Sequence, residues 1–266
     1  CPSTSLAYFF QCSSASRGLL PLEAIEAGLY PDDEVPAVRA FAEKVLTRLG
    51  TEGRWMANFA SESAKSSSAN ISIGTTATRT DGGWLLNGVK AFGCATGVAD
   101  DYLVTARRAD GETAEYLAVF LVDRAAAGGR ERERWDAVGM RATATHGIIL
   151  EDVFVPDDDA MAVPGAFVKM LQVSRGSFVG SQVAGTAVYL GAAQAADDDA
   201  IDHLTSMTVA DTGKPIGTAP VHQQLIGHMR NELDTAVLWL RRQVQLETSD
   251  PPLLPKNDVI RQWRLA

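Results

Sequence analysis

The segment Asp81-Gly82-Gly83-Trp84-Leu85-Leu86-Asn87-Gly88-Val89-Lys90-Ala91-Phe92 gives the clearest indication of how this chain folds. Its first three residues predict a tight hairpin turn, because glycine readily adopts the positive φ angles that such turns require. The apolar run that begins at Trp84 predicts a strand after the turn. Before the turn, residues 71–77 alternate in the manner of a half-buried strand. The segment therefore indicates a β-hairpin.

Further apolar runs follow the hairpin at 102–106, 116–122 and 147–155. The spacings between them are too short for crossover helices, so we expect a mainly antiparallel sheet. Helical periodicity flanks this region, most clearly at 33–49 and 219–246. The sequence thus predicts an α+β protein with an N-terminal helical domain (1–54), a central antiparallel β domain (55–157) and a C-terminal helical bundle (158–266).

Composition and charge exclude several classes of protein. The chain has 266 residues, of which 46% are hydrophobic and 21% charged, as expected for a folded globular protein. Its net charge is −9 and no stretch is densely basic, so nucleic acid is not an expected partner. No apolar stretch approaches the roughly 20 residues that cross a bilayer, so membrane insertion is not expected.

The cysteines and histidines indicate neither a disulfide framework nor a metal site. Three cysteines, at positions 1, 12 and 94, form an odd number without metal-ligand spacing, which favours a reducing compartment and hence the cytoplasm. The four histidines also lack such spacing. The chain opens with Cys rather than Met and stops within a helix-like stretch, so we expect it to be part of a longer sequence.

Two segments are candidates for binding a ligand. Residues 58–68 are rich in short hydroxyl side chains, which suit a pyrophosphate or the edge of a flavin ring, although an ordinary serine-rich loop is also compatible with them. Phe92 and Cys94 lie two apart, and so are expected on one face of a strand. There the ring either covers a planar ligand or packs in the core. Glycine fingerprints for a dinucleotide or a phosphate loop are absent.

Four motifs in register carry a family resemblance. They are Gly82-Gly83-Trp84-Leu85-Leu86-Asn87-Gly88-Val89-Lys90-Ala91-Phe92, then Ala99-Asp100, then Gly139-Met140-Arg141-Ala142-Thr143, and Leu150-Glu151-Asp152-Val153-Phe154-Val155-Pro156. In this order they closely resemble the acyl-CoA dehydrogenase family, with both ends shortened. The resemblance implies that family's three-domain fold, FAD as cofactor, an acyl-CoA thioester as substrate and a place in lipid metabolism.

The resemblance also implies which residues contact the cofactor. In the loop before the first long strand, Ser61 matches a family threonine and Ser67 a family serine, so this loop is expected to contact the flavin and the pyrophosphate. The family's Trp-x-Thr matches Phe92-Gly93-Cys94, in which Phe can stack on the flavin and Cys is a weaker hydrogen-bond donor. The cofactor-binding residues implied in this way are Asn58, Ser61, Ser66, Ser67, Phe92, Cys94 and Gln224, the last across a subunit interface.

For the reaction, the resemblance implies α,β-dehydrogenation, with Arg175 near the substrate. Ser174 stands where one branch of the family has its catalytic glutamate, and the commoner branch places its base beyond Ala266. Electron-transfer flavoprotein is the implied electron acceptor, and the implied assembly is a homodimer, a homotetramer or a pair with a homologous subunit. Two alternatives stay open: a flavin-dependent monooxygenase of the same superfamily, and a non-catalytic paralogue.

Overall fold

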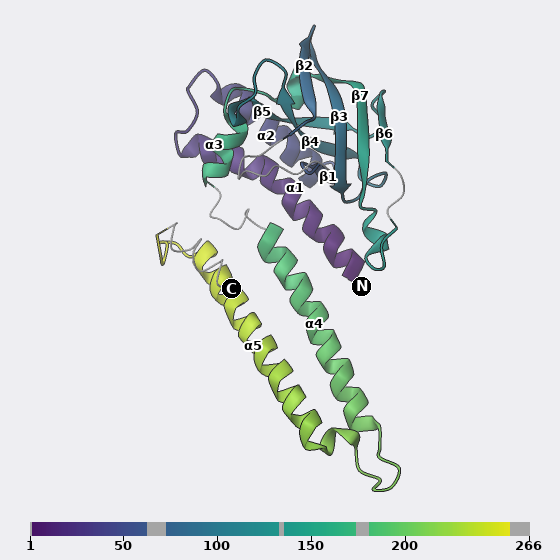
Figure 1. The fold of residues 1–266 in the computed structure, drawn as a ribbon. Helices are drawn as coiled ribbons and strands as arrows, with labels where there is room; N and C mark the ends of the chain where they lie inside the picture. The colour runs from purple at the N-terminus through teal and green to yellow at the C-terminus, as the bar shows by residue number, and fades with distance from the viewer. Residues whose placement is uncertain (1, 63–72, 133–135, 174–180, 256–266) are drawn as a thin grey trace. The chain divides into compact units, whose positions relative to one another are not determined.

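The chain forms two compact units in a computed structural model that describes residues 2–62, 73–132, 136–173 and 181–255. The first unit lies within Ser3–Ser174 and the second within Gln182–Ala266. Figure 1 shows a sheet with helices in the first unit and a pair of long helices in the second. Within the described ranges, no helix combines the length and the apolar character that crossing a membrane requires. The finer division into domains at 54 and 157 stays a prediction.

In its described residues, the first unit has three α-helices and a sheet. The helices are α1 (Pro2–Glu26), α2 (Val35–Gly50) and α3 (Ala166–Val173). The strands are β1 (Met56–Phe59), β2 (Thr76–Thr80), β3 (Gly83–Gly93), β4 (Asp101–Arg108), β5 (Leu117–Asp123), β6 (Gly129–Glu131), β7 (His146–Pro156) and β8 (Ala160–Met161). Short 3-10 turns lie at Ala114–Tyr116, Arg141–Thr143 and Asp157–Asp159.

The strands form one sheet in the order β6-β7-β3-β2-β4-β5-β8, with β1 beside β4. The predicted hairpin is confirmed: β2 and β3 are antiparallel, Thr80 pairs with Gly83, and Gly82 has a φ of +71°. The mainly antiparallel sheet is also confirmed, but β1 and β2 both run parallel to β4. The spacing of apolar runs could not predict the β1–β4 pair, because the β2–β3 hairpin lies between these two strands in the sequence.

Strands β4 and β5 are buried on both faces, each face in its own core, whereas β3 and β7 also carry exposed residues such as Val89 and Phe154. On β4, Tyr102 and Val104 belong to a core inside the curved sheet, while Leu103 belongs to a second core with α1, α2 and α3. This division follows from the alternation of side chains along a strand. Trp84 of β3 meets Phe120 of β5 edge to face, with ring centroids 5.9 Å apart. Since these strands are not neighbours, the sheet folds over on itself.

The second unit is a helical hairpin of α4 (Ser181–Ser206) and α5 (Pro220–Thr248), joined through a 3-10 turn at Ile216–Thr218 (Figure 1). The helix expected at 219–246 is therefore confirmed. Arg230 of α5 donates to Asp197 of α4 at 2.8 Å, an ion pair across the hairpin. The apolar stripe of α5 is only partly covered: Leu233 is buried, whereas Leu225 and Met229 are exposed.

Candidate functional site

Strained backbone marks the loops where β3 ends and β7 begins. Among the described residues, five that are not glycine have positive φ, and four of them lie here: Phe92 at the end of β3, and Ala95, Met140 and Ala144 in the loops. A side chain makes this conformation costly, by about 1–2 kcal/mol per residue, so the surrounding structure has to enforce it. Such strain gathers at functional sites, which makes this edge of the sheet the first candidate.

Hydrogen bonds hold the two loops together. The Ala95 amide donates to the Thr143 carbonyl at 2.8 Å, and the Thr96 amide donates to the Ala144 carbonyl at 3.1 Å. Within the first loop, the Thr96 hydroxyl donates to the Gly93 carbonyl at 2.5 Å. The left-handed residues therefore sit in a frame of bonds that fixes their conformation.

Phe92 presents its ring at this edge. It lies at a register shift between Ala91 and Gly93, where β3 bulges against β7, and 60% of the residue is exposed. The expectation that Phe92 and Cys94 share one face of a strand is wrong: β3 ends at Gly93, and Cys94 lies in the following turn. The bulge and the φ of +53° at Phe92 interrupt the alternation on which that expectation rested.

The end of β1 comes to the same edge. Gly93 packs so closely on Phe59 of β1 that a Cβ atom at position 93 would overlap the Phe59 ring. Just beyond β1, the Ala91 amide donates to the Ser61 carbonyl at 2.9 Å. The structure thus brings Ser61, which is exposed, alongside the residue that precedes Phe92.

Cys94 ends a short chain of polar side chains. The Thr145 hydroxyl donates to Cys94 Sγ at 3.1 Å, and the hydroxyls of Thr143 and Thr145 are 2.6 Å apart. Burial raises the pKa of the Cys94 thiol, against the opposing effect of the bond from Thr145. Cys94 is therefore a protonated thiol at neutral pH, with its own hydrogen available as a weak donor.

A buried ion pair lies behind the edge and was not predicted. Lys90 Nζ of β3 donates to Glu62 Oε1 at 2.7 Å, and the Lys90 side chain is 0% exposed. Burial opposes the ionisation of Glu62, but hydrogen bonds from Lys90, Thr75 and Gly74 outweigh it and lower the Glu62 pKa. Burial lowers the pKa of Lys90 as well, against the attraction of Glu62. The signal available in the sequence was a lysine within the apolar register of a strand.

The remaining expected site residues lie elsewhere or cannot be placed. Asn58 of β1 bonds to α1: its Oδ1 accepts from Arg17 Nε at 3.2 Å, and its Nδ2 donates to the Ser14 hydroxyl at 3.0 Å. Gln224 is an exposed residue of α5 in the second unit. Ser66, Ser67 and Arg175 lie outside the described residues.

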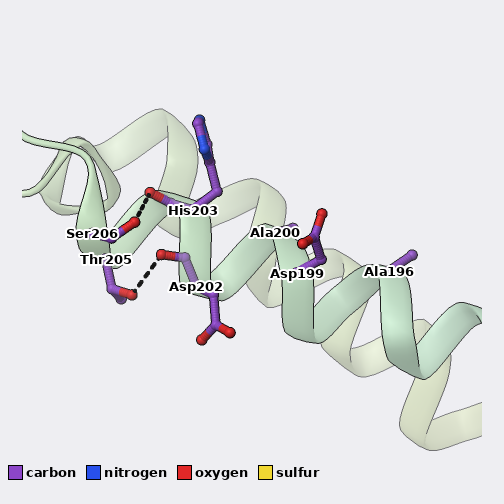
Figure 2. Close-up of a pocket in the computed structure, with 7 residues that line it drawn as sticks. All are labelled: Ala196, Asp199, Ala200, Asp202, His203, Thr205 and Ser206. Carbon is purple, nitrogen blue, oxygen red and sulfur yellow. Dashed lines mark hydrogen bonds between the residues drawn. The ribbon is translucent and has the colours of Figure 1, made fainter.

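A separate hollow lies along α4 in the second unit, and Figure 2 shows that its polar groups do not converge. The carboxylates of Asp199 and Asp202 point to different sides of the helix. The hydroxyls of Thr205 and Ser206 donate to carbonyls one turn earlier, at Asp202 and His203. These groups are occupied by their own helix, so we place no site there.

Two family models match the chain. One, described as the acyl-CoA dehydrogenase middle domain, matches residues 57–153, and the other, described as the acyl-CoA dehydrogenase C-terminal domain, matches residues 183–259. Together they span more than half of the 266 residues. The chain belongs to the acyl-CoA dehydrogenase family. Members of this family are flavin oxidoreductases with FAD as their cofactor, and the resemblance seen in the sequence motifs is confirmed.

The curated relatives include proteins named as dehydrogenases and others named as monooxygenases. A putative acyl-CoA dehydrogenase, YdbM, from Bacillus subtilis is 34% identical over 174 residues, which cover 65% of this chain and 43% of that protein. A dibenzothiophene monooxygenase from Rhodococcus erythropolis is 30% identical over 166 residues, which cover 60% of this chain and 39% of that protein. The chain therefore spans less than half the length of these relatives.

Solved structures share the fold. A glutaryl-CoA dehydrogenase from Mycobacterium smegmatis, in complex with FADH2, aligns with a TM-score of 0.65 at 22% identity. The alignment covers 80% of this chain and 52% of that one. The predicted α+β, acyl-CoA dehydrogenase-like fold is thereby confirmed.

Proposed function

We propose that this chain forms the flavin-binding part of an enzyme that carries out FAD-dependent α,β-dehydrogenation of an acyl-CoA thioester. One observation carries the proposal: in a chain of this family, the exposed residue Phe92 lies at a strained edge of the sheet, and the hydroxyl-bearing Ser61 is hydrogen-bonded to the residue just before it, Ala91. An exposed ring suits the flat face of a flavin, and hydroxyl groups suit its polar rim.

The donor set at this edge fits FAD, and each residue can be given a role. Phe92 would cover one face of the ring system. The Ser61 hydroxyl and the Cys94 thiol would donate to its polar atoms, the thiol more weakly than the hydroxyl. Asn58, Ser66 and Ser67 are proposed to support the rest of the cofactor, and Gln224 to reach it from another subunit. These residues would hold FAD, whose chemistry would be to take up a hydride from the substrate.

The proton-transfer half of the reaction requires groups that we do not assign among the described residues of this edge. A base must remove the proton next to the thioester carbonyl, and that proton becomes acidic only if hydrogen-bond donors stabilise the developing negative charge. Arg175 is proposed to lie near the acyl-CoA, and a carboxylate beyond Ala266 is proposed as the base. Exclusion of water would raise the pKa of that carboxylate toward the value the reaction needs.

Anaerobic titration of the FAD-loaded, full-length protein with acyl-CoA thioesters of increasing chain length tests the proposal. We expect at least one thioester to bleach the flavin absorbance in proportion to enoyl-CoA formed. Retention of full flavin absorbance with every thioester in the series would exclude dehydrogenation. A preparation that takes up no FAD would instead support a non-catalytic paralogue.

Flavin-dependent monooxygenation is the second candidate. Phe92 and Cys94 replace the tryptophan and threonine that the dehydrogenase motif implies, and a relative is named dibenzothiophene monooxygenase. After chemical reduction of the flavin, a monooxygenase should consume oxygen rapidly and transfer labelled oxygen to an organic substrate. Slow reoxidation by oxygen together with bleaching by acyl-CoA would favour the dehydrogenase.

The family membership also suggests an electron acceptor, a cellular compartment and an oligomeric state. Electron-transfer flavoprotein is the proposed acceptor of electrons from the reduced cofactor, within lipid metabolism in the cytoplasm. A homodimer or homotetramer, or a pair with a homologous subunit, is supported by the exposed apolar residues Val221, Leu225 and Met229, which recur every four residues along α5. A stripe of this kind is expected to be covered by another helix.

A further inference from the structure

We infer that Glu62 and Lys90 are positioning residues, which hold the loop after β1 against β3 so that Ser61 lies beside Phe92. The inference rests on the proposed function in one respect: the placement of Ser61 matters because Ser61 is proposed to bind FAD. We assign neither side chain a contact with the cofactor or the substrate. Each would act through the backbone of the residues it holds.

Glu62 joins three segments of the chain. Its Oε1 accepts from Lys90 Nζ at 2.7 Å, from the Thr75 hydroxyl at 2.7 Å and from the Thr75 amide at 3.0 Å. Its Oε2 accepts from the Gly74 amide at 2.6 Å. One carboxylate thereby ties the loop after β1 to β3 and to the residues just before β2.

Consecutive residues of β3 bind consecutive residues of the loop. Lys90 Nζ reaches the Ala60 carbonyl at 3.5 Å as well as the Glu62 carboxylate, and the Ala91 amide donates to the Ser61 carbonyl at 2.9 Å. Phe92 follows directly in the chain. The Lys90 ammonium therefore holds the two neighbours of Ser61, and the Ala91 amide holds Ser61 itself. Together these bonds fix the position of Ser61 relative to the end of β3.

Packing cannot provide this placement, because Ser61 is exposed and has a small polar side chain. Charge-assisted hydrogen bonds are directional and stronger than neutral ones, so they can define the path of an exposed loop. The Lys90 ammonium is fully buried and needs a partner, and removal of Glu62 would leave it uncompensated. Loss of either Glu62 or Lys90 should therefore release the loop from β3.

The experiment uses the full-length protein and four variants: Glu62→Gln, Lys90→Met, the double variant, and Asp101→Asn. Asp101 provides a matched control, because its side chain is 0% exposed and paired with Arg48 and Arg54 at 2.8 and 2.7 Å, and it lies beside Met56 at the opposite end of β1 from the loop. For each protein, FAD affinity is measured by titration well below the melting temperature, and the melting temperature of the cofactor-free form is measured separately.

We expect Glu62→Gln and Lys90→Met to weaken FAD binding at least tenfold. Asp101→Asn should lower the melting temperature but leave the FAD dissociation constant within twofold of the parent. The double variant removes the buried charge along with its partner, so it should recover stability without recovering FAD affinity. Parent-like FAD affinity in folded Glu62→Gln and Lys90→Met would overturn the inference.

Hydrogen exchange of the cofactor-free protein separates this inference from the proposed function. The Ala91, Gly74 and Thr75 amides should exchange at least tenfold faster in Glu62→Gln than in the parent, and at the parental rate in Asp101→Asn. That pattern in a parent protein that binds no FAD would retain the positioning role and overturn only the flavin site. Unchanged exchange in Glu62→Gln would overturn the positioning role itself.

Discussion

The two ends of strand β3 carry two aromatic residues in opposite situations. Near the hairpin, Trp84 is 8% exposed, lies in the inner core and has the guanidinium groups of Arg79 and Arg108 over its ring, at 5.1 and 5.6 Å from the centroid. At the other end, Phe92 is 60% exposed in left-handed backbone. One end contributes stability, and the other, which bears the cost of backbone strain, is the end that we propose to contact FAD.

The largest effect is expected at the stable end. Trp84→Ala removes a buried ring that meets Phe120 and two guanidinium groups, so the free energy of unfolding should fall by about 3–5 kcal/mol. Urea denaturation followed by circular dichroism measures this loss. A loss below about 1 kcal/mol would show that the two ends of β3 do not differ as described.

The next effect is expected at Gly93, where the strand end touches β1. Gly93→Ala introduces a Cβ atom that overlaps the Phe59 ring, so Phe59 or the strand end must move. Overpacking of this kind costs about 1–3 kcal/mol. Urea denaturation should show that loss, and FAD affinity should fall with it because the end of β1 is displaced. Unchanged stability and FAD affinity in Gly93→Ala would mean that contact with β1 does not hold the end of β3 in place.

Acid should weaken the pair behind the edge. The Glu62 pKa is lowered from 4.5 in the folded chain, so the stability that its ionisation contributes is complete above about that pH and is lost as the pH falls further. Denaturation midpoints measured between neutral and acidic pH should therefore decline less steeply in Glu62→Gln than in the parent. Equal declines in the parent and in Glu62→Gln would contradict a lowered pKa of Glu62.

Phe92→Ala should leave stability nearly unchanged while it weakens cofactor binding. Because the residue is largely exposed, the loss in unfolding free energy should stay below about 1 kcal/mol. The dissociation constant for FAD should rise at least tenfold. A large loss of stability with unchanged FAD affinity would make Phe92 a packing residue like Trp84.

The smallest effect is expected at Ala144, which has a φ of +45°. Glycine tolerates this conformation without steric cost, and its greater freedom in the unfolded chain offsets part of the gain. Ala144→Gly should therefore be neutral or stabilising by less than about 1 kcal/mol in thermal unfolding. A clear destabilisation would show that the alanine methyl group makes contacts that outweigh the strain.

The contrast along β3 also explains how far the sequence could predict the structure. The hairpin at Asp81-Gly82 was predictable because turn residues and apolar runs agree with each other there. The bulge at Phe92 was not, since nothing in the local pattern signals an extra residue between Ala91 and Gly93. Alternation alone therefore placed Cys94 on the strand, when it lies in the turn beyond.

Non-local contacts limited the prediction of the site in the same way. The family resemblance implies Ser61 and Phe92 as flavin contacts, and only the fold shows that Ser61 lies beside Ala91, the residue before Phe92. The partner of Lys90 is 28 residues away in sequence, so a search for motifs could not pair it with Glu62. Buried charges become recognisable as a pair only when burial is known.

Titration of the cofactor-free protein with FAD, run side by side with Phe92→Ala and Ser61→Ala, is the most direct test of the account. We predict saturable binding of one FAD per chain in the parent, with the flavin fluorescence quenched. Both variants should bind at least tenfold more weakly while they unfold at the parental urea midpoint. FAD binding of parental strength in both folded variants, or no binding by the parent, would contradict the account.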